Sequence, residues 1–129
     1  MTRDETLLQL RPEIAADTSG NPPDSPGYFM HYTLRPVLKL QNDLLLDIFR
    51  HHIRKTKGAI LQLPAEKRPE YIAHTIRQDL KLRNLFTGVI LGQFTAPEWQ
   101  FYHLHEAELS RRIADLLIQR LSDQLGKLV

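Results

Sequence analysis

Apolar side chains recur at helical spacing along most of the chain. Three long segments show this pattern, at residues 25–57, 65–92 and 95–125, and a short one occupies residues 1–12. In each segment an apolar residue returns every three or four positions, which places these side chains along one side of an α-helix. No segment alternates between apolar and polar residues for long enough to form a β-strand. The pattern predicts an all-α fold, a bundle of three long amphipathic helices with a short N-terminal helix.

Residues that begin, end or distort helices mark the limits of the long segments. Thr95, followed three residues later by Glu98, predicts a capping box at the start of the last helix. Gly58 is typical of the position just after a helix, so we expect the first helix to stop there. Pro36 removes one backbone hydrogen bond inside that first helix, which predicts either a kink or two abutting helices.

The chain divides into three parts on these criteria. Residues 1–14 form a short N-terminal helical segment that begins at Thr2, with Glu5 three residues later. Residues 15–27 are rich in Gly, Pro, Ser, Asp and Asn, and they predict a flexible linker. Residues 28–129 form the helical bundle domain, and 129 residues are enough for a single core without disulfides or a metal.

Composition removes several classes of function. The chain has no cysteine, which excludes disulfides, thiolate metal sites and thiol catalysis, and which fits a reducing compartment such as the cytoplasm. It has no run of about 18 apolar residues, so we expect no membrane span. The formal net charge is only +2. The one dense basic stretch, residues 50–57, ends a predicted helix, where the helix dipole favours positive charge, so nucleic acid is not the expected partner.

Six polar side chains interrupt the predicted apolar faces and are the candidate ligand-binding residues: His52, Asp79, Arg83, His103, Glu106 and Arg120. A charge that is buried alone costs several kcal/mol, so these groups are expected to pair, to reach solvent or to hold a ligand. Asp79 and Arg83 have the spacing of an ion pair along one helix. Glu106 has no such partner on its own helix, and Arg83 or His52 is expected to meet it from another. An interhelical salt-bridge network and a polar ligand pocket are both consistent with this pattern.

Metal and catalytic motifs are weak. His103 and Glu106 are three residues apart, and His52 would have to join them to complete a three-ligand site. The Glu-x-x-His pairs of di-metal bundles and the His-Glu-x-x-His motif are both absent. We therefore assign no catalytic residue, no metal and no cofactor, and we do not expect an enzyme.

Two stretches and the N-terminus resemble a known family. Residues 33–43 read TLRPVLKLQND, residues 88–95 read GVILGQFT with Glu98 after them, and residues 8–13 read LQLRPE. Together they resemble a family of short, all-helical bacterial proteins, some of which carry the label glyoxalase. Glyoxalase-type metalloenzymes place their ligands on strands, and this chain has no predicted strand. The resemblance therefore implies a small bacterial domain and no catalytic position.

The leading functional interpretation is a cytoplasmic helical interaction module that self-associates, most simply as a homodimer, or that binds another protein. Six apolar residues fall outside the main apolar faces and indicate a second apolar surface: Phe29, Tyr32, Leu46, Phe101, Leu104 and Ile118. Alternatively, the N-terminal helix covers them. The alternative function is a small-molecule or metal-binding helical bundle, an enzyme in that case, that uses the six polar candidates.

Overall fold

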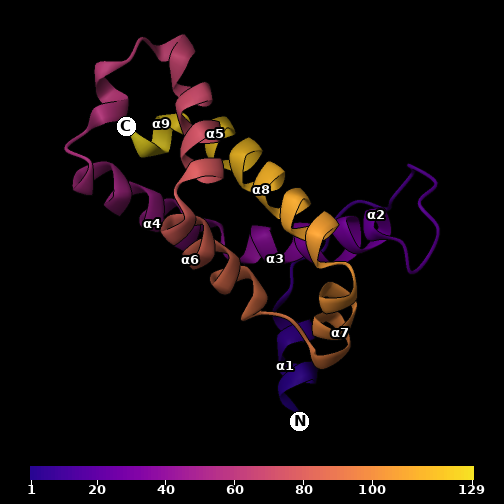
Figure 1. Ribbon diagram of the computed structural model, residues 1–129. Coiled ribbons are helices and arrows are strands. Elements are labelled where there is room, and N and C mark those ends of the chain that lie inside the picture. The colour runs from indigo at the N-terminus through magenta and orange to yellow at the C-terminus, as the bar shows by residue number, and fades with distance from the viewer.

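The computed structural model describes residues 1–129 and is built from helices alone, with no strand. This confirms the all-α prediction. None of the helices is long and apolar enough to cross a lipid bilayer. Figure 1 shows the path of the chain, whose elements are α1 (Arg3–Leu10), α2 (Pro26–Phe29), the π-helix η1 (Met30–Leu34), α3 (Arg35–Leu40), α4 (Asn42–Lys55), the 3-10 helices η2 (Ala59–Gln62) and η3 (Ala65–Lys67), α5 (Arg68–Gln78), α6 (Leu80–Leu91), α7 (Ala96–Leu104), α8 (Glu106–Asp123) and α9 (Leu125–Leu128).

Each of the three predicted long helices is divided, so the bundle of three continuous helices is not confirmed. The first becomes α2, η1, α3 and α4, with a break at Gln41. The second is interrupted at Asp79, whose extended backbone separates α5 from α6. The third is interrupted at His105, which lies between α7 and α8. Apolar spacing carries across these breaks, which is why it did not reveal them.

The irregularity expected at Pro36 is present as a π-helical turn. The backbone N–H of Arg35 donates to the carbonyl of Met30, five residues back instead of four. Proline has no N–H of its own, and its ring crowds the carbonyl four residues earlier. The wider turn immediately before Pro36 accommodates this crowding while the chain continues in a helical direction.

The end of α4 lies close to the predicted stop at Gly58. The N–H of Gly58 donates to the carbonyl of Ile53 at 2.8 Å, and the N–H of Lys57 donates to that of Arg54 at 3.0 Å. These two bonds form a Schellman motif, which satisfies carbonyls at the helix end. The left-handed conformation that the motif needs falls on Lys57, with φ of 58°, and Gly58 follows with φ of 70°.

Both predicted capping boxes are confirmed. At α7, the backbone N–H of Thr95 donates to Glu98 Oε1 at 2.8 Å, and Thr95 Oγ1 accepts from the N–H of Glu98. At α1, Thr2 and Glu5 make the same reciprocal pair. These bonds satisfy backbone donors that have no partner within the helix.

The core lies where α5 crosses α8, and this pair makes the most extensive contact between elements. The helix α6 leads away from this crossing. The chain then turns into α7, which connects the far end of α6 to the start of α8 (Figure 1). The largest side chains of this core are completely or almost completely buried, among them Phe49, Phe86, Ile76, Leu109 and Leu117. The elements α3 and α4 contribute further buried residues to the core.

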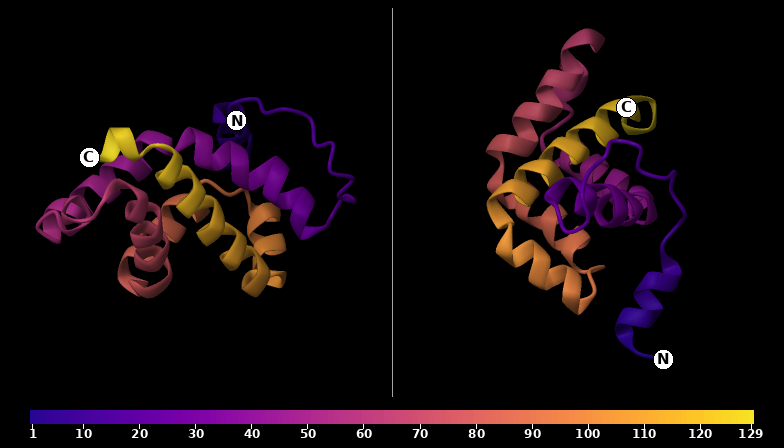
Figure 2. Two further views of the ribbon diagram at one scale, coloured as in Figure 1. Left: turned by 90° about the horizontal axis from the view of Figure 1, so that it is seen from above. Right: turned by 90° about the vertical axis from the view of Figure 1, so that its right-hand side faces the viewer.

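The N-terminal segment contacts the turn between α6 and α7. The guanidinium of Arg3 donates to the carbonyls of Phe94 and Gly92, both at 2.9 Å, while both carboxylate oxygens of Asp4 accept from the N–H of Ala96. The chain between α1 and α2 then follows an extended path along the outside of η1 and α3 (Figure 2). The predicted mobility of residues 15–27 stays a prediction.

Candidate functional site: a groove between α6, α7 and α8

The six polar candidates lie in separate places. Arg83 and Glu106 line one groove between α6, α7 and α8. His52 and Asp79 line a second cleft, between α4 and α6. Arg120 lies in a third, between α3 and α8. His103 is exposed on α7, where its ring stacks on Trp99 with centroids 5.9 Å apart. The single polar centre considered from the sequence does not form.

Several of the predicted pairings are wrong for a physical reason. Asp79 does not form an ion pair with Arg83; its carboxylate accepts a hydrogen bond from the N–H of Leu82 at 3.0 Å and caps α6. Glu106 is exposed at the start of α8 rather than directed into the core. No three His, Asp or Glu side chains converge on one point, so His52 does not join His103 and Glu106. The breaks at Asp79 and His105 change the direction of each helix and with it the face that each residue presents.

The groove is bordered by α6 on one side and by α7 and α8 on the other, and its lining mixes apolar and polar residues. On α6 the lining residues follow the helical spacing 80, 84, 87 and 91, which places them along one face. Because the chain turns at His105, α7 and α8 both border the groove opposite this face. It encloses about 300 Å³ and is lined by Leu80, Arg83, Asn84, Thr87, Leu91, Trp99, Tyr102, Glu106 and Ser110.

Two large apolar side chains in this groove are in contact with water. Leu80 on α6 is 64% exposed, and Trp99 on α7 is 47% exposed. Tyr102, which also lines the groove, is by contrast buried, and its hydroxyl is hydrogen-bonded to Ser110 Oγ at 2.8 Å. An exposed leucine is ordinary on its own, but two large apolar side chains that flank one groove are typical of a binding surface.

Two side chains of opposite charge also border the groove, but they do not form an ion pair. Arg83 comes from α6 and Glu106 from the start of α8, and no ion pair within 4.0 Å joins them or involves either of them. Arg83 is half-buried, so its stem packs along the groove wall, and Glu106 is exposed. Both charges are therefore free to interact with a molecule that occupies the groove.

Two of the six candidates, His52 and Asp79, line the cleft between α4 and α6, and the charge of Asp79 affects the pKa of His52. Burial lowers the pKa of His52 below its usual 6.5, and the negative charge of Asp79 partly opposes this effect. The positive charges of Lys55 and His51 act in the same direction as burial. The carboxylate of Asp79 caps α6, and this role accounts for its position in the cleft. We therefore assign the cleft no ligand.

The second apolar surface expected from the sequence does not form as predicted. Phe29 and Leu46 are buried, and Phe101 and Ile118 pack against the core, so only Leu104 and Tyr32 of the six stay exposed. The residues that line the groove, Leu80 and Trp99, were not singled out by the sequence. Asp79 is the sequence signal that would have identified Leu80. A helix that begins after Asp79 places Leu80 in the first turn of α6 instead of in the interior of a long helix.

Comparison with known proteins identifies no relative: no family model, no curated protein and no solved structure matches the chain. The resemblance to a bacterial helical family therefore stays a prediction.

Proposed function

We propose that this protein is a helical interaction module that self-associates as a homodimer through the groove between α6, α7 and α8. The observation that carries the proposal is the exposure of Leu80 and Trp99 on opposite walls of one groove. Leucine and tryptophan lose contact with water when a second surface covers them, and each buried Å² of apolar surface contributes about 25 cal/mol. Tryptophan is also among the residues that most often dominate the binding energy of an interface.

The charges favour a second copy of the chain as the occupant. In a twofold dimer whose axis passes through the groove, the α6 wall of one protomer faces the α7–α8 wall of the other. Arg83 of one protomer would then face Glu106 of its partner, and Glu106 would face the partner's Arg83. The two charges that find no partner within one chain would form two equivalent ion pairs in the dimer.

The backbone of α6 also supports close approach. Gly88 is exposed, and a Cβ atom at this position would have no heavy atom within 4 Å. It lies one turn after Asn84 on the helix, next to the residues that line the groove. A helix that packs there can approach α6 more closely than a larger side chain would allow.

The place of action proposed for this dimer is the cytoplasm of a bacterium. Support for the compartment comes from the complete absence of cysteine, which is typical of chains that do not rely on oxidative folding. Support for the bacterial origin comes from the resemblance of residues 33–43 and 88–95 to a bacterial family.

Sedimentation velocity over the micromolar concentration range tests this proposal. The wild-type chain should pass from monomer to dimer as its concentration rises, and Leu80→Lys should stay monomeric over the same range. The matched control is Leu8→Lys, because Leu8 on α1 is also more than half exposed but does not line the groove. A wild-type chain that is monomeric throughout, or an equal loss of dimer in Leu8→Lys, would overturn the proposal.

A further inference from the structure

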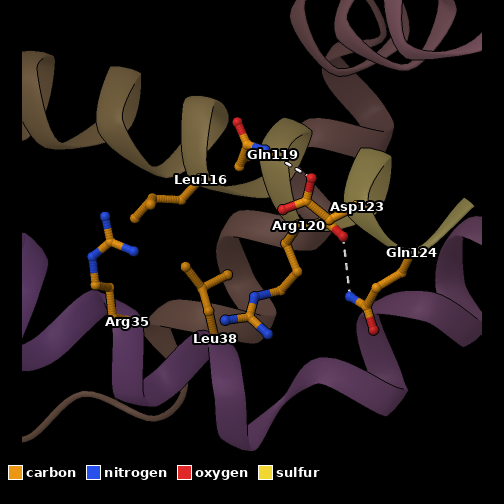
Figure 3. A pocket seen from close by; sticks show the side chains of 7 residues that line it. All are labelled: Arg35, Leu38, Leu116, Gln119, Arg120, Asp123 and Gln124. Carbon is orange, nitrogen blue, oxygen red and sulfur yellow. Dashed lines mark hydrogen bonds between the residues drawn. The ribbon is translucent and has the colours of Figure 1, made fainter. Parts of the chain in front are cut away.

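The third cleft, between α3 and α8, shares no residue with the groove. Figure 3 shows Arg35 and Leu38 on α3, and Leu116, Gln119, Arg120 and Asp123 on α8, with Gln124 at the C-terminal end of that helix. The cleft encloses about 250 Å³. Two arginines and two leucines therefore border one small concave space.

The guanidinium of Arg120 is positioned by a hydrogen bond to Asn42. Its Nη1 donates to Asn42 Oδ1 at 3.1 Å. Asn42 and Gln124 are joined by two reciprocal amide hydrogen bonds of 2.8 and 2.9 Å, and Gln124 also donates to the carbonyl of Arg120 at 3.0 Å. This network fixes Asn42 and leaves most of the five N–H donors of Arg120 without a protein partner.

No carboxylate forms an ion pair with either of the two arginines. Neither Arg35 nor Arg120 takes part in an ion pair. Asp123 is the one acidic residue that lines the cleft, and Gln119 donates to its Oδ1 at 2.8 Å. Burial, and secondly the positive charge of Arg35, lower the pKa of Arg120, and Asp123 offsets this only in part. Two like charges of this kind are stabilised when an anion lies between them.

We propose that this cleft binds the carboxylate of a small organic acid. Arginine presents N–H donors in a planar fork that matches a carboxylate. The three charged lining residues are Arg35, Arg120 and Asp123, so the cleft carries a net charge of +1 and matches a single negative charge better than a phosphate dianion. The half-buried Leu116 supplies an apolar surface for a short aliphatic chain attached to that carboxylate; Leu38 also lines the cleft but is buried.

Isothermal titration calorimetry of the full chain with butyrate, and separately with inorganic phosphate, tests this assignment. Butyrate should bind saturably at one site per chain, and phosphate should bind more weakly. Arg35→Gln and Arg120→Gln should each weaken butyrate binding at least about tenfold, the loss expected when a contact of 1.4 kcal/mol is removed. Arg35 is exposed, so its replacement leaves the core intact even if Arg120→Gln disturbs the fold.

The matched control is Arg54→Gln, which removes an exposed arginine of α4 that lines none of the clefts described. It should bind butyrate as the wild type does. Absence of saturable butyrate binding, unchanged binding in Arg35→Gln, or tighter binding of phosphate than of butyrate would each overturn the proposal. Dimer formation is measured separately, so the failure of either proposal leaves the other standing.

Discussion

Arg11 and Glu98 join the N-terminal segment to the start of α7 by two parallel hydrogen bonds of 2.5 and 2.6 Å. Their side chains are only 8% and 15% exposed. Arg11 also donates to the carbonyl of Gln93 at 2.7 Å, and Glu98 accepts from Thr33 at 3.1 Å. The carboxylate that completes the capping box of α7 therefore also fixes the N-terminal segment against the helices.

Replacement of Arg11 by methionine should lower the free energy of unfolding by about 3 kcal/mol, at the lower end of the cost of breaking a buried ion pair. The reason is that Glu98 keeps its charge while it loses its main partner. Urea denaturation followed by circular dichroism measures the effect. Arg111→Met, which replaces an exposed arginine without an ion pair, is the matched control and should change stability little. Equal stabilities of the two variants would show that the Arg11–Glu98 pair does not hold the segment in place.

The same pair should make stability depend on acid. Burial alone would raise the pKa of Glu98, but the hydrogen bonds from Arg11 and Thr95 and the charge of Arg11 outweigh it and leave the pKa below its usual 4.5. A carboxylate with a lowered pKa in the folded state contributes stability above the unfolded pKa, and this contribution is lost as the pH falls through the folded pKa. Unfolding measured from neutral pH to below pH 4.5 should show a loss of stability that is smaller in Arg11→Met. Parallel pH profiles for the two proteins would contradict this assignment.

Replacement of Lys57 by glycine should stabilise the protein by about 0.5 to 1 kcal/mol. The left-handed conformation of Lys57, with φ of 58°, costs an ordinary residue about 1–2 kcal/mol, and glycine avoids most of that cost despite its greater freedom when unfolded. Thermal and urea denaturation measure the gain. Lys55→Gly, at the last residue of α4, should instead destabilise by up to about 1 kcal/mol. A loss of stability in Lys57→Gly would mean that the end of α4 is not the Schellman motif described.

The pKa of His52 should lie below 6.5 in a titration followed by NMR, because burial disfavours its charged form. The unfolded chain then binds a proton more readily than the folded one, so stability should rise with pH between the folded pKa and 6.5 and be level above it. Asp79→Asn keeps a good helix cap but removes the opposing charge, so it should lower the pKa of His52 further. Asp115→Asn, whose partner is Arg77, is the control and should leave it unchanged.

Local signals in the sequence predicted local structure well. The capping boxes at Thr2 and Thr95 depend on residues three positions apart, and the irregularity at Pro36 on the chemistry of one ring, so both could be read without the fold. The breaks at Asp79 and His105 were missed because the apolar spacing continues through them. Asp79 is a good N-cap in the middle of an apparently continuous helix, but its spacing from Arg83 equally predicts an ion pair along one helix.

The candidate sites were harder to predict because they depend on which helices pack against one another. Arg83 and Glu106 do line one groove, but the contact expected between them does not form. Arg35 was not a candidate, since its partner Arg120 lies 85 residues later and only the packing of α3 on α8 brings them to one cleft. The exposure of Leu80 and Trp99 likewise follows from the angles at which α6, α7 and α8 meet.

The central claim, dimer formation through the groove, is tested most directly by mixing two charge-reversed chains. Arg83→Glu leaves two negative charges on the groove, and Glu106→Arg leaves two positive ones, so each variant alone should dimerise at least about tenfold more weakly than the wild type. An equimolar mixture restores both opposite-charge contacts across the twofold axis. Sedimentation equilibrium should therefore detect a heterodimer in the mixture at concentrations where each variant alone is monomeric. A mixture that is as monomeric as its separate components would contradict the proposed interface.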